Sequence, residues 1–156
     1  MIGRDKQGRR LARTVMAGAT LLGLLSCSPA GPHPDATVGV VVRDFRISPS
    51  RQNIPAGTVE FAVHDRGPST HEFVVIRTDL PADHLPLERD GLTVDEDSPL
   101  LHSVGEITDL NIGQSGELSL RLRPGRYVLF CNLEGHYLGG MHATIEVSGE
   151  TGSSSS

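Results

Sequence analysis

Three observations from the sequence predict an all-β protein with the fold of a Greek-key β-sandwich. Short runs rich in Val, Ile, Thr and aromatic residues recur along residues 36–148, and several of them alternate polar with apolar side chains. Pro and Gly separate these runs, as in 55–57 and 123–125, and predict turns there. No long stretch carries a helical period. Short strands punctuated by turns at this spacing are typical of two packed sheets.

Each expected strand has its own pattern. The run 58–63 alternates cleanly, as does 116–122, so one face of each should lie in the core. The run 37–42 is β-branched, and 126–130 leads directly into Cys131. The expected strands, in chain order, are 37–42, 58–63, 72–77, 116–122, 126–130 and 143–147.

The segment 78–105 does not fit the strand pattern. It is long, and it contains Pro81, Pro86 and Pro99. We expect an insert here, either a long loop or a short helix near 82–89, packed over one side of the sandwich with no chemistry of its own. Its acidic group at 95–97 lacks the ligand spacing of a calcium loop and is interpreted as a solvated charge cluster.

Residues 1–27 have the features of a lipoprotein-type signal segment. Five basic residues precede an eleven-residue apolar run, 15–25, which is too short to span a bilayer. The stretch from Leu24 to Cys27 resembles the lipobox of bacterial lipoproteins, which implies cleavage before Cys27 and lipidation of its sulfur. An ordinary signal peptide with an incidental Cys27 is the alternative. Residues 28–35 are predicted to form a flexible tether, 36–148 one domain, and 149–156 a disordered tail.

The charge balance excludes one class of partner. Five of the 14 basic residues and one of the 19 acidic residues lie in the first 27 positions, which leaves a formal charge of −9 for the remainder. No basic stripe is present to neutralise phosphates, so we expect no nucleic acid as a partner. The acidic surface is compatible with a basic redox partner, but an ordinary solvated surface is the simpler explanation and the one we favour.

The most informative residues are Cys131, His136 and Met141, which follow one another at steps of five in a turn-rich segment. A thiolate, an imidazole and a thioether together suit copper better than zinc, iron or calcium. Once Cys27 carries lipid, Cys131 is a lone thiol in an exported domain, and metal ligation would protect it. Taken singly, these residues would be a core cysteine, a loop histidine and a core methionine; the hypothesis depends on their combination.

A trigonal copper site needs a second histidine. His71 is the best candidate by position, and His64, at the end of the 58–63 strand, is its main competitor. His142 follows Met141 directly and would point to the opposite face of a strand. We interpret the other histidines as surface or structural residues: His33, His64, His84, His102 and His142.

On these residues the chain resembles the cupredoxins, the blue-copper family, over about 36–148. The even ligand spacing is similar to that of the auracyanin and rusticyanin type. The resemblance implies an eight-stranded sandwich with one type 1 copper at one end, held by His71, Cys131 and His136 with Met141 as the axial ligand. It also implies that His136, beside Tyr137 and Leu138, reaches a shallow apolar surface patch. Glu72 stands where many cupredoxins carry Asn, a residue that steadies the neighbouring loop and the Cys sulfur. We therefore expect the hydrogen bonding around the Cys131 sulfur to differ from that of these relatives.

The predicted function is single-electron transfer between redox proteins outside the cytoplasm, by a monomer anchored to the membrane through Cys27. Membrane oxidoreductases or cytochromes would be its partners. The alternative is a copper-binding or copper-delivery protein that supplies a cuproenzyme. A copper enzyme is disfavoured, because the chain has one domain and no His-X-His pair, and a binuclear centre would need a second cysteine in the loop.

Overall fold

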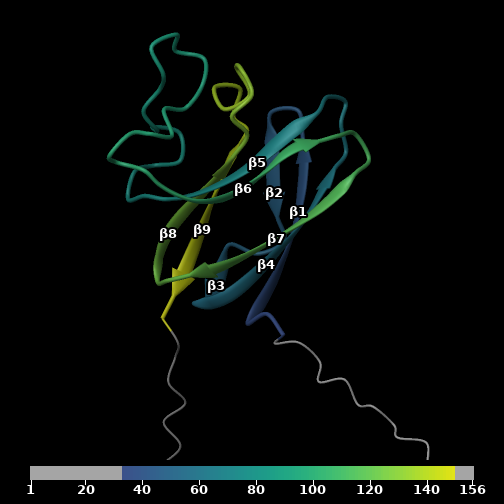
Figure 1. The fold of residues 1–156 in the computed structure, drawn as a ribbon, viewed down its shortest axis with the longest axis vertical. Helices are drawn as coiled ribbons and strands as arrows, with labels where there is room; N and C mark the ends of the chain where they lie inside the picture. The colour runs from purple at the N-terminus through teal and green to yellow at the C-terminus, as the bar shows by residue number, and fades with distance from the viewer. Residues whose placement is uncertain (1–32, 150–156) are drawn as a thin grey trace, which may run out of the picture. The chain divides into compact units, whose positions relative to one another are not determined.

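The computed structural model describes residues 33–149, so the predicted signal segment, most of the tether and nearly all of the predicted tail lie outside the described residues. The described part is a sandwich of two β-sheets (Figure 1). The predicted all-β Greek-key sandwich is confirmed, and no helix occurs between residues 33 and 149. Consequently no helix in that range is long and apolar enough to cross a membrane.

The first sheet has four strands in the order β2-β1-β4-β7. Its members are β1 (Ala36–Arg43), β2 (Arg46–Pro49), β4 (Gly57–Asp65) and β7 (Ser115–Leu122). The strands β1 and β4 run parallel, whereas β1 with β2 and β4 with β7 are antiparallel.

The second sheet has five strands in the order β3-β9-β8-β5-β6. Its members are β3 (Asn53–Pro55), β5 (His71–Arg77), β6 (His102–Leu110), β8 (Gly125–Phe130) and β9 (His142–Ser148). The strand β3 runs parallel to β9, and the other pairs are antiparallel.

All six predicted strands are present, as β1, β4, β5, β7, β8 and β9. The expectation of eight strands is wrong by one, because residues 33–149 form nine. The segment after β1 makes two short strands, since β2 pairs in the first sheet and β3 crosses to the second. The strand β6 begins at His102, within the expected insert.

The main core lies between the sheets. Alternate residues of β1 and β4 point inward, so Val38, Val40, Phe61 and Val63 are buried against residues of β5, β8 and β9. The rings of Phe61 and Phe73 meet across the two sheets with centroids 5.5 Å apart. This packing makes a rigid frame whose strand ends carry the site described below.

The insert 78–101 is a loop, not a helix, which corrects the alternative of a helix near 82–89. A short bridge between Leu87 and Val94 gives it hairpin character. Its apolar residues Leu85, Val94 and Leu101 are buried against the outer face of β5 and β8, as the expected flap requires. These two strands are therefore covered on both faces, which explains their nearly unbroken apolar sequences.

Candidate metal centre

The four candidate ligands meet at one end of the sandwich. Cys131 follows directly on β8, and His71 is the first residue of the neighbouring strand β5. The loop after Cys131 turns back on itself through two backbone bonds, from Met141 N–H to the His136 carbonyl at 3.0 Å and from Cys131 N–H to the Met141 carbonyl at 3.2 Å. In Figure 1 this yellow-green loop stands at the end opposite to the start of β1 and the end of β9.

The sulfur of Cys131 lies among the other candidate groups. It is 3.5 Å from His136 Nδ1, and the His71 and His136 ring centroids are 5.3 Å apart. Cys131, His71 and Met141 have no solvent exposure, while His136 is half-buried. Soft donors are thus gathered in a dry site with one imidazole at its surface.

A backbone N–H donates a hydrogen bond to the sulfur. The N–H of Glu72 lies 3.3 Å from Cys131 Sγ, so the replacement of Asn by Glu at this position leaves that hydrogen bond in place. The Glu72 side chain is in an unfavourable setting: burial, and then the carboxylates of Glu106, Glu96 and Asp109, raise its pKa. Glu72 therefore alters the charge near the site and leaves the contact between the N–H and the sulfur in place.

The protonation states of the free side chains depend on burial. Burial raises the pKa of the Cys131 thiol; the N–H groups of Glu72 and Leu133 oppose this, and the carboxylates of Glu72 and Asp65 reinforce it. Burial, followed by His71, lowers the pKa of His136, so this imidazole is neutral at neutral pH. A bound cation would supply the positive charge that a buried thiolate lacks, and it would displace the thiol proton on binding.

His71 lies between two aspartates that sequence reasoning did not find. Its Nε2 is 3.1 Å from Asp44 Oδ1, which also accepts a hydrogen bond from the Ser69 hydroxyl. Its Nδ1 is 3.0 Å from Asp65 Oδ1, but the two atoms are not aligned as a hydrogen bond. Asp44 lies in the β1–β2 turn and Asp65 ends β4, so only the tertiary fold brings them to β5.

The competing histidines lie elsewhere. His64 Nδ1 contacts the Ser115 hydroxyl at 3.0 Å, and since its neighbours Val63 and Asp65 point inward, its own side chain points to the outer face of β4. His142 packs against Tyr137 with ring centroids 5.4 Å apart. His33, His84 and His102 are exposed.

The surface beside His136 differs from the expected patch in one residue. Tyr137 is 4% exposed, and its hydroxyl accepts the Leu85 N–H at 2.8 Å, so it anchors the insert instead of facing solvent. Phe45, which the sequence did not suggest, takes its place: it is 52% exposed, and its ring meets the His136 ring edge-on at 5.6 Å. Leu138, also 52% exposed, is at the surface as expected.

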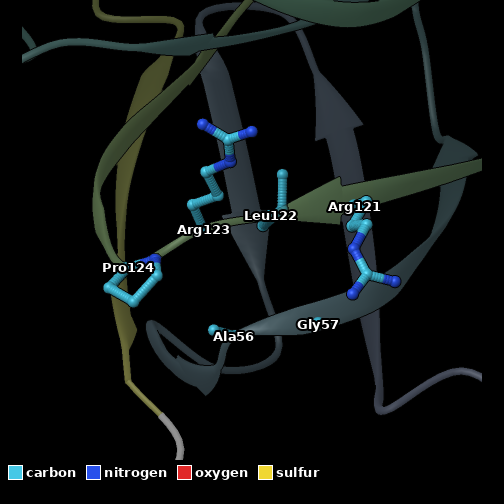
Figure 2. Close-up of a pocket in the computed structure, with 6 residues that line it drawn as sticks. All are labelled: Ala56, Gly57, Arg121, Leu122, Arg123 and Pro124. Atoms are coloured by element: carbon cyan, nitrogen blue, oxygen red, sulfur yellow. The ribbon is translucent and has the colours of Figure 1, made fainter.

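A shallow hollow lies at the other end of the sandwich and is not part of this centre (Figure 2). Its volume is about 540 Å³, and it is formed where β4 begins and β7 ends. None of the candidate ligands lines it, and it holds no carboxylate, thiol or imidazole. Its lining residues are Ala56, Gly57, Arg121, Leu122, Arg123 and Pro124.

The cupredoxin-like domain family matches residues 14–144, which is most of the chain. The chain is a cupredoxin. No curated protein sequence matches it. Among solved structures, auracyanin B is similar with 24% identity and a TM-score of 0.53, over 76% of this chain and 93% of that one.

Two further structures have the same fold. Dithionite-reduced auracyanin from Roseiflexus castenholzii has 17% identity and a TM-score of 0.52, over 75% of this cupredoxin and 99% of that chain. Reduced rusticyanin has 19% identity and a TM-score of 0.50, over 77% and 89%. The predicted family and its auracyanin- and rusticyanin-like fold are confirmed, and the family's cofactor is a single type 1 copper ion.

The residues present fit copper. Within 33–149, no group of three or more His, Cys, Asp or Glu side chains is arranged so that it could hold a metal ion by itself. The fit therefore depends on the mixed set of imidazole, thiolate and thioether donors, which is the set that copper prefers. It also depends on His71 Nδ1, a fully buried nitrogen without a hydrogen-bond partner. Such an atom is costly unless a cation or proton occupies its lone pair.

Proposed function

We propose that this cupredoxin transfers single electrons between redox proteins outside the cytoplasm, with copper held by His71, Cys131, His136 and Met141. The observation that carries the proposal is the convergence of these donors at one end of the sandwich, with Cys131 Sγ 3.5 Å from His136 Nδ1. The second sheet holds His71 at the start of β5 and Cys131 directly after the neighbouring strand β8. A rigid donor set reduces the rearrangement that accompanies each change between Cu(I) and Cu(II).

The half-buried His136 is the proposed route for the electron. It is the least buried of the four donors. The exposed ring of Phe45, from the β1–β2 turn, packs against it, and Leu138 is exposed two residues further along the same loop. A small apolar surface allows brief docking, as transient redox encounters require. Membrane oxidoreductases or cytochromes are the proposed partners, and the protein is proposed to act as a monomer and not as an enzyme.

The first experiment is to record the visible and EPR spectra of the chain after addition of Cu(II). We expect an intense thiolate-to-copper band that is lost in Cys131→Ser, because no other thiolate is present in residues 33–149. His64→Ala, which changes a histidine outside the centre, should keep the band. A colourless protein, or a copper spectrum unchanged in Cys131→Ser, would overturn the ligand assignment.

Copper exchange separates electron transfer from copper delivery. The complete burial of His71, Cys131 and Met141 favours retention of the ion through many redox cycles. A carrier should keep its copper when a Cu(I) chelator of moderate affinity is added to the reduced protein. Rapid, complete transfer to that chelator would favour delivery instead.

The anchor is proposed from the sequence, because Cys27 lies outside the described residues. Lipidation of Cys27 would keep the protein at the outer side of the cell membrane, facing the periplasm or the extracellular space. Cells fed a labelled fatty acid should label the wild-type protein and not Cys27→Ser. Equal labelling of both, or of neither, would contradict the anchor and leave the copper proposal untouched.

A further inference from the structure

A buried carboxylate lies beside the candidate centre and has no role in the assignment above. Asp65, the last residue of β4, is completely buried. Its Oδ1 is 3.0 Å from Nδ1 of His71, the nitrogen whose lone pair has no hydrogen-bond partner. Fully buried carboxylates are rare in proteins unless a cation or several donors compensate them.

The hydrogen bonds of Asp65 compensate only half of its carboxylate. Oδ1 accepts the Gly67 N–H at 2.6 Å, which shapes the turn that follows β4. Oδ2 has no partner at all. The turn therefore explains why a residue with one acceptor stands here, but it does not explain a carboxyl group whose second oxygen is buried and unpaired.

The tautomer of His71 makes its contact with Asp65 less favourable. Its Nε2 lies 3.1 Å from Asp44 Oδ1, so in the neutral imidazole Nε2 carries the proton and Nδ1 the lone pair. A lone pair next to a carboxylate oxygen is repulsive at 3.0 Å. Two neighbouring buried acceptors without a donor between them indicate a place for a positive charge.

We propose that Asp65 is a further group of the metal centre, with its carboxylate beside the ion that His71 binds. The negative charge of this carboxylate favours Cu(II) over Cu(I). This inference rests on the proposed ligand set. Opposite charges attract more strongly in a dry site than in water, and the attraction is larger for the divalent ion. Carboxylate oxygen is also a harder donor than the thiolate and thioether, which suit Cu(I).

The decisive variant is Asp65→Asn in the full chain. Asparagine keeps an oxygen that can accept the Gly67 N–H, so the turn is preserved while the charge is removed. We expect the preference for Cu(II) over Cu(I) to fall at least tenfold, which raises the reduction potential by about 59 mV for a one-electron couple. The affinity of the metal-free protein for Zn(II), measured by competition with a chelator, should also fall at least tenfold.

Asp44→Asn is the matched control. It removes a carboxylate from the other nitrogen of the same ring, but the Asp44 side chain is 31% exposed and screened by water. Its effect on potential and on Zn(II) affinity should be clearly smaller than that of Asp65→Asn. If both variants shift the two quantities equally, the special role of Asp65 is wrong and only net charge near the site matters.

Two outcomes keep this inference separate from the proposed function. A wild-type protein without a thiolate-to-copper band contradicts the function itself. If the wild-type band is present and Asp65→Asn folds with unchanged potential and Zn(II) affinity, Asp65 is a turn residue only and the inference is overturned. Should Asp65→Asn fail to fold, Asp65→Ser retains a hydroxyl acceptor for Gly67 and is subject to the same two measurements.

Discussion

At the scale of single residues, the Cys131 sulfur has a main-chain hydrogen-bond donor that residue 72 supplies. The Glu72 N–H donates to Sγ, while the Glu72 side chain lies near other carboxylates. A main-chain N–H is present whatever side chain its residue carries. A position that often carries Asn in the family can therefore carry Glu here without loss of this hydrogen bond. Burial of the Glu72 carboxyl group near other carboxylates should instead lower the free energy of unfolding.

This separation predicts the result of Glu72→Gln. The N–H donor is retained, so the energy of the thiolate-to-copper band should be unchanged in the visible spectrum of the copper-loaded protein. Val75→Ala, a core change on the same strand, serves as the control for non-specific loosening. A band that moves with Glu72→Gln and not with Val75→Ala would show that the Glu72 side chain acts on the sulfur.

The ligand segment could be predicted from sequence because Cys131, His136 and Met141 are close together along the chain, with a recognisable spacing. His71 required an argument from position, and it lies on the strand next to β8. Asp44, Phe45 and Asp65 could not be predicted, since they lie on the turn after β1 and at the end of β4. Only the packing of the two sheets brings the aspartates to His71 and Phe45 to His136. The assignment of all four ligands remains a prediction.

At the scale of elements, strands with a strong pattern were predicted and weakly patterned ones were missed. The strand β4 alternates buried with mostly half-buried residues, and β5 and β8 are apolar because the insert covers them. By contrast, β6 is mostly exposed and polar, and β2 and β3 have four and three residues. Such segments become strands through pairing with neighbours, which no local pattern reveals.

The insert 78–101 is held by polar contacts as well as apolar ones. The Asn132 side chain bonds both main-chain groups of Val94, at 2.7 Å to its N–H and 3.1 Å to its carbonyl, and donates to Glu96 Oε1 at 2.7 Å. Because Asn132 directly follows Cys131, the insert braces the start of the ligand loop. The expected flap therefore has a structural role beside the metal centre.

Glu96 predicts a pH-dependent effect. Burial raises its pKa; the Asn132 amide opposes this, and Glu106 and Asp97 reinforce it. With a raised pKa in the folded state, Glu96 favours folding fully below the unfolded value, about 4.3 for Glu, and this contribution is lost as pH rises through the folded pKa. Glu96→Gln keeps the acceptor for Asn132, so it should stabilise the metal-free protein at pH 7 and have little effect at pH 4.

The gain should be at most about 1 kcal/mol, since Glu96 is partly solvated and its interactions are screened. Urea unfolding of both proteins at the two pH values measures it. Glu117→Gln, on the exposed side of β7, is the matched control and should change stability by less at either pH. Equal gains at pH 4 and pH 7 would contradict the electrostatic explanation.

At the scale of the whole molecule, two sheets share one core and should unfold together. The contact of Phe61 with Phe73 joins β4 of the first sheet to β5 of the second. Phe61→Ala should therefore destabilise the entire sandwich by about 3–5 kcal/mol, in a single urea transition. Leu100→Ala, at a residue that is 61% exposed, should stay within about 0.5 kcal/mol of wild type. Separate transitions for the two sheets would contradict a common core.

The architecture has a practical consequence for how the protein can be mounted. The strand β1 begins and β9 ends at the side of the sandwich away from Cys131 (Figure 1). The six residues of β8 separate that side from Cys131, a span of roughly 20 Å. If residue 33 or residue 149 were fixed to a gold electrode, the His136 edge would face the bulk solution. Current should then depend on a dissolved mediator, whereas attachment through Leu138→Cys would connect the metal to the gold directly.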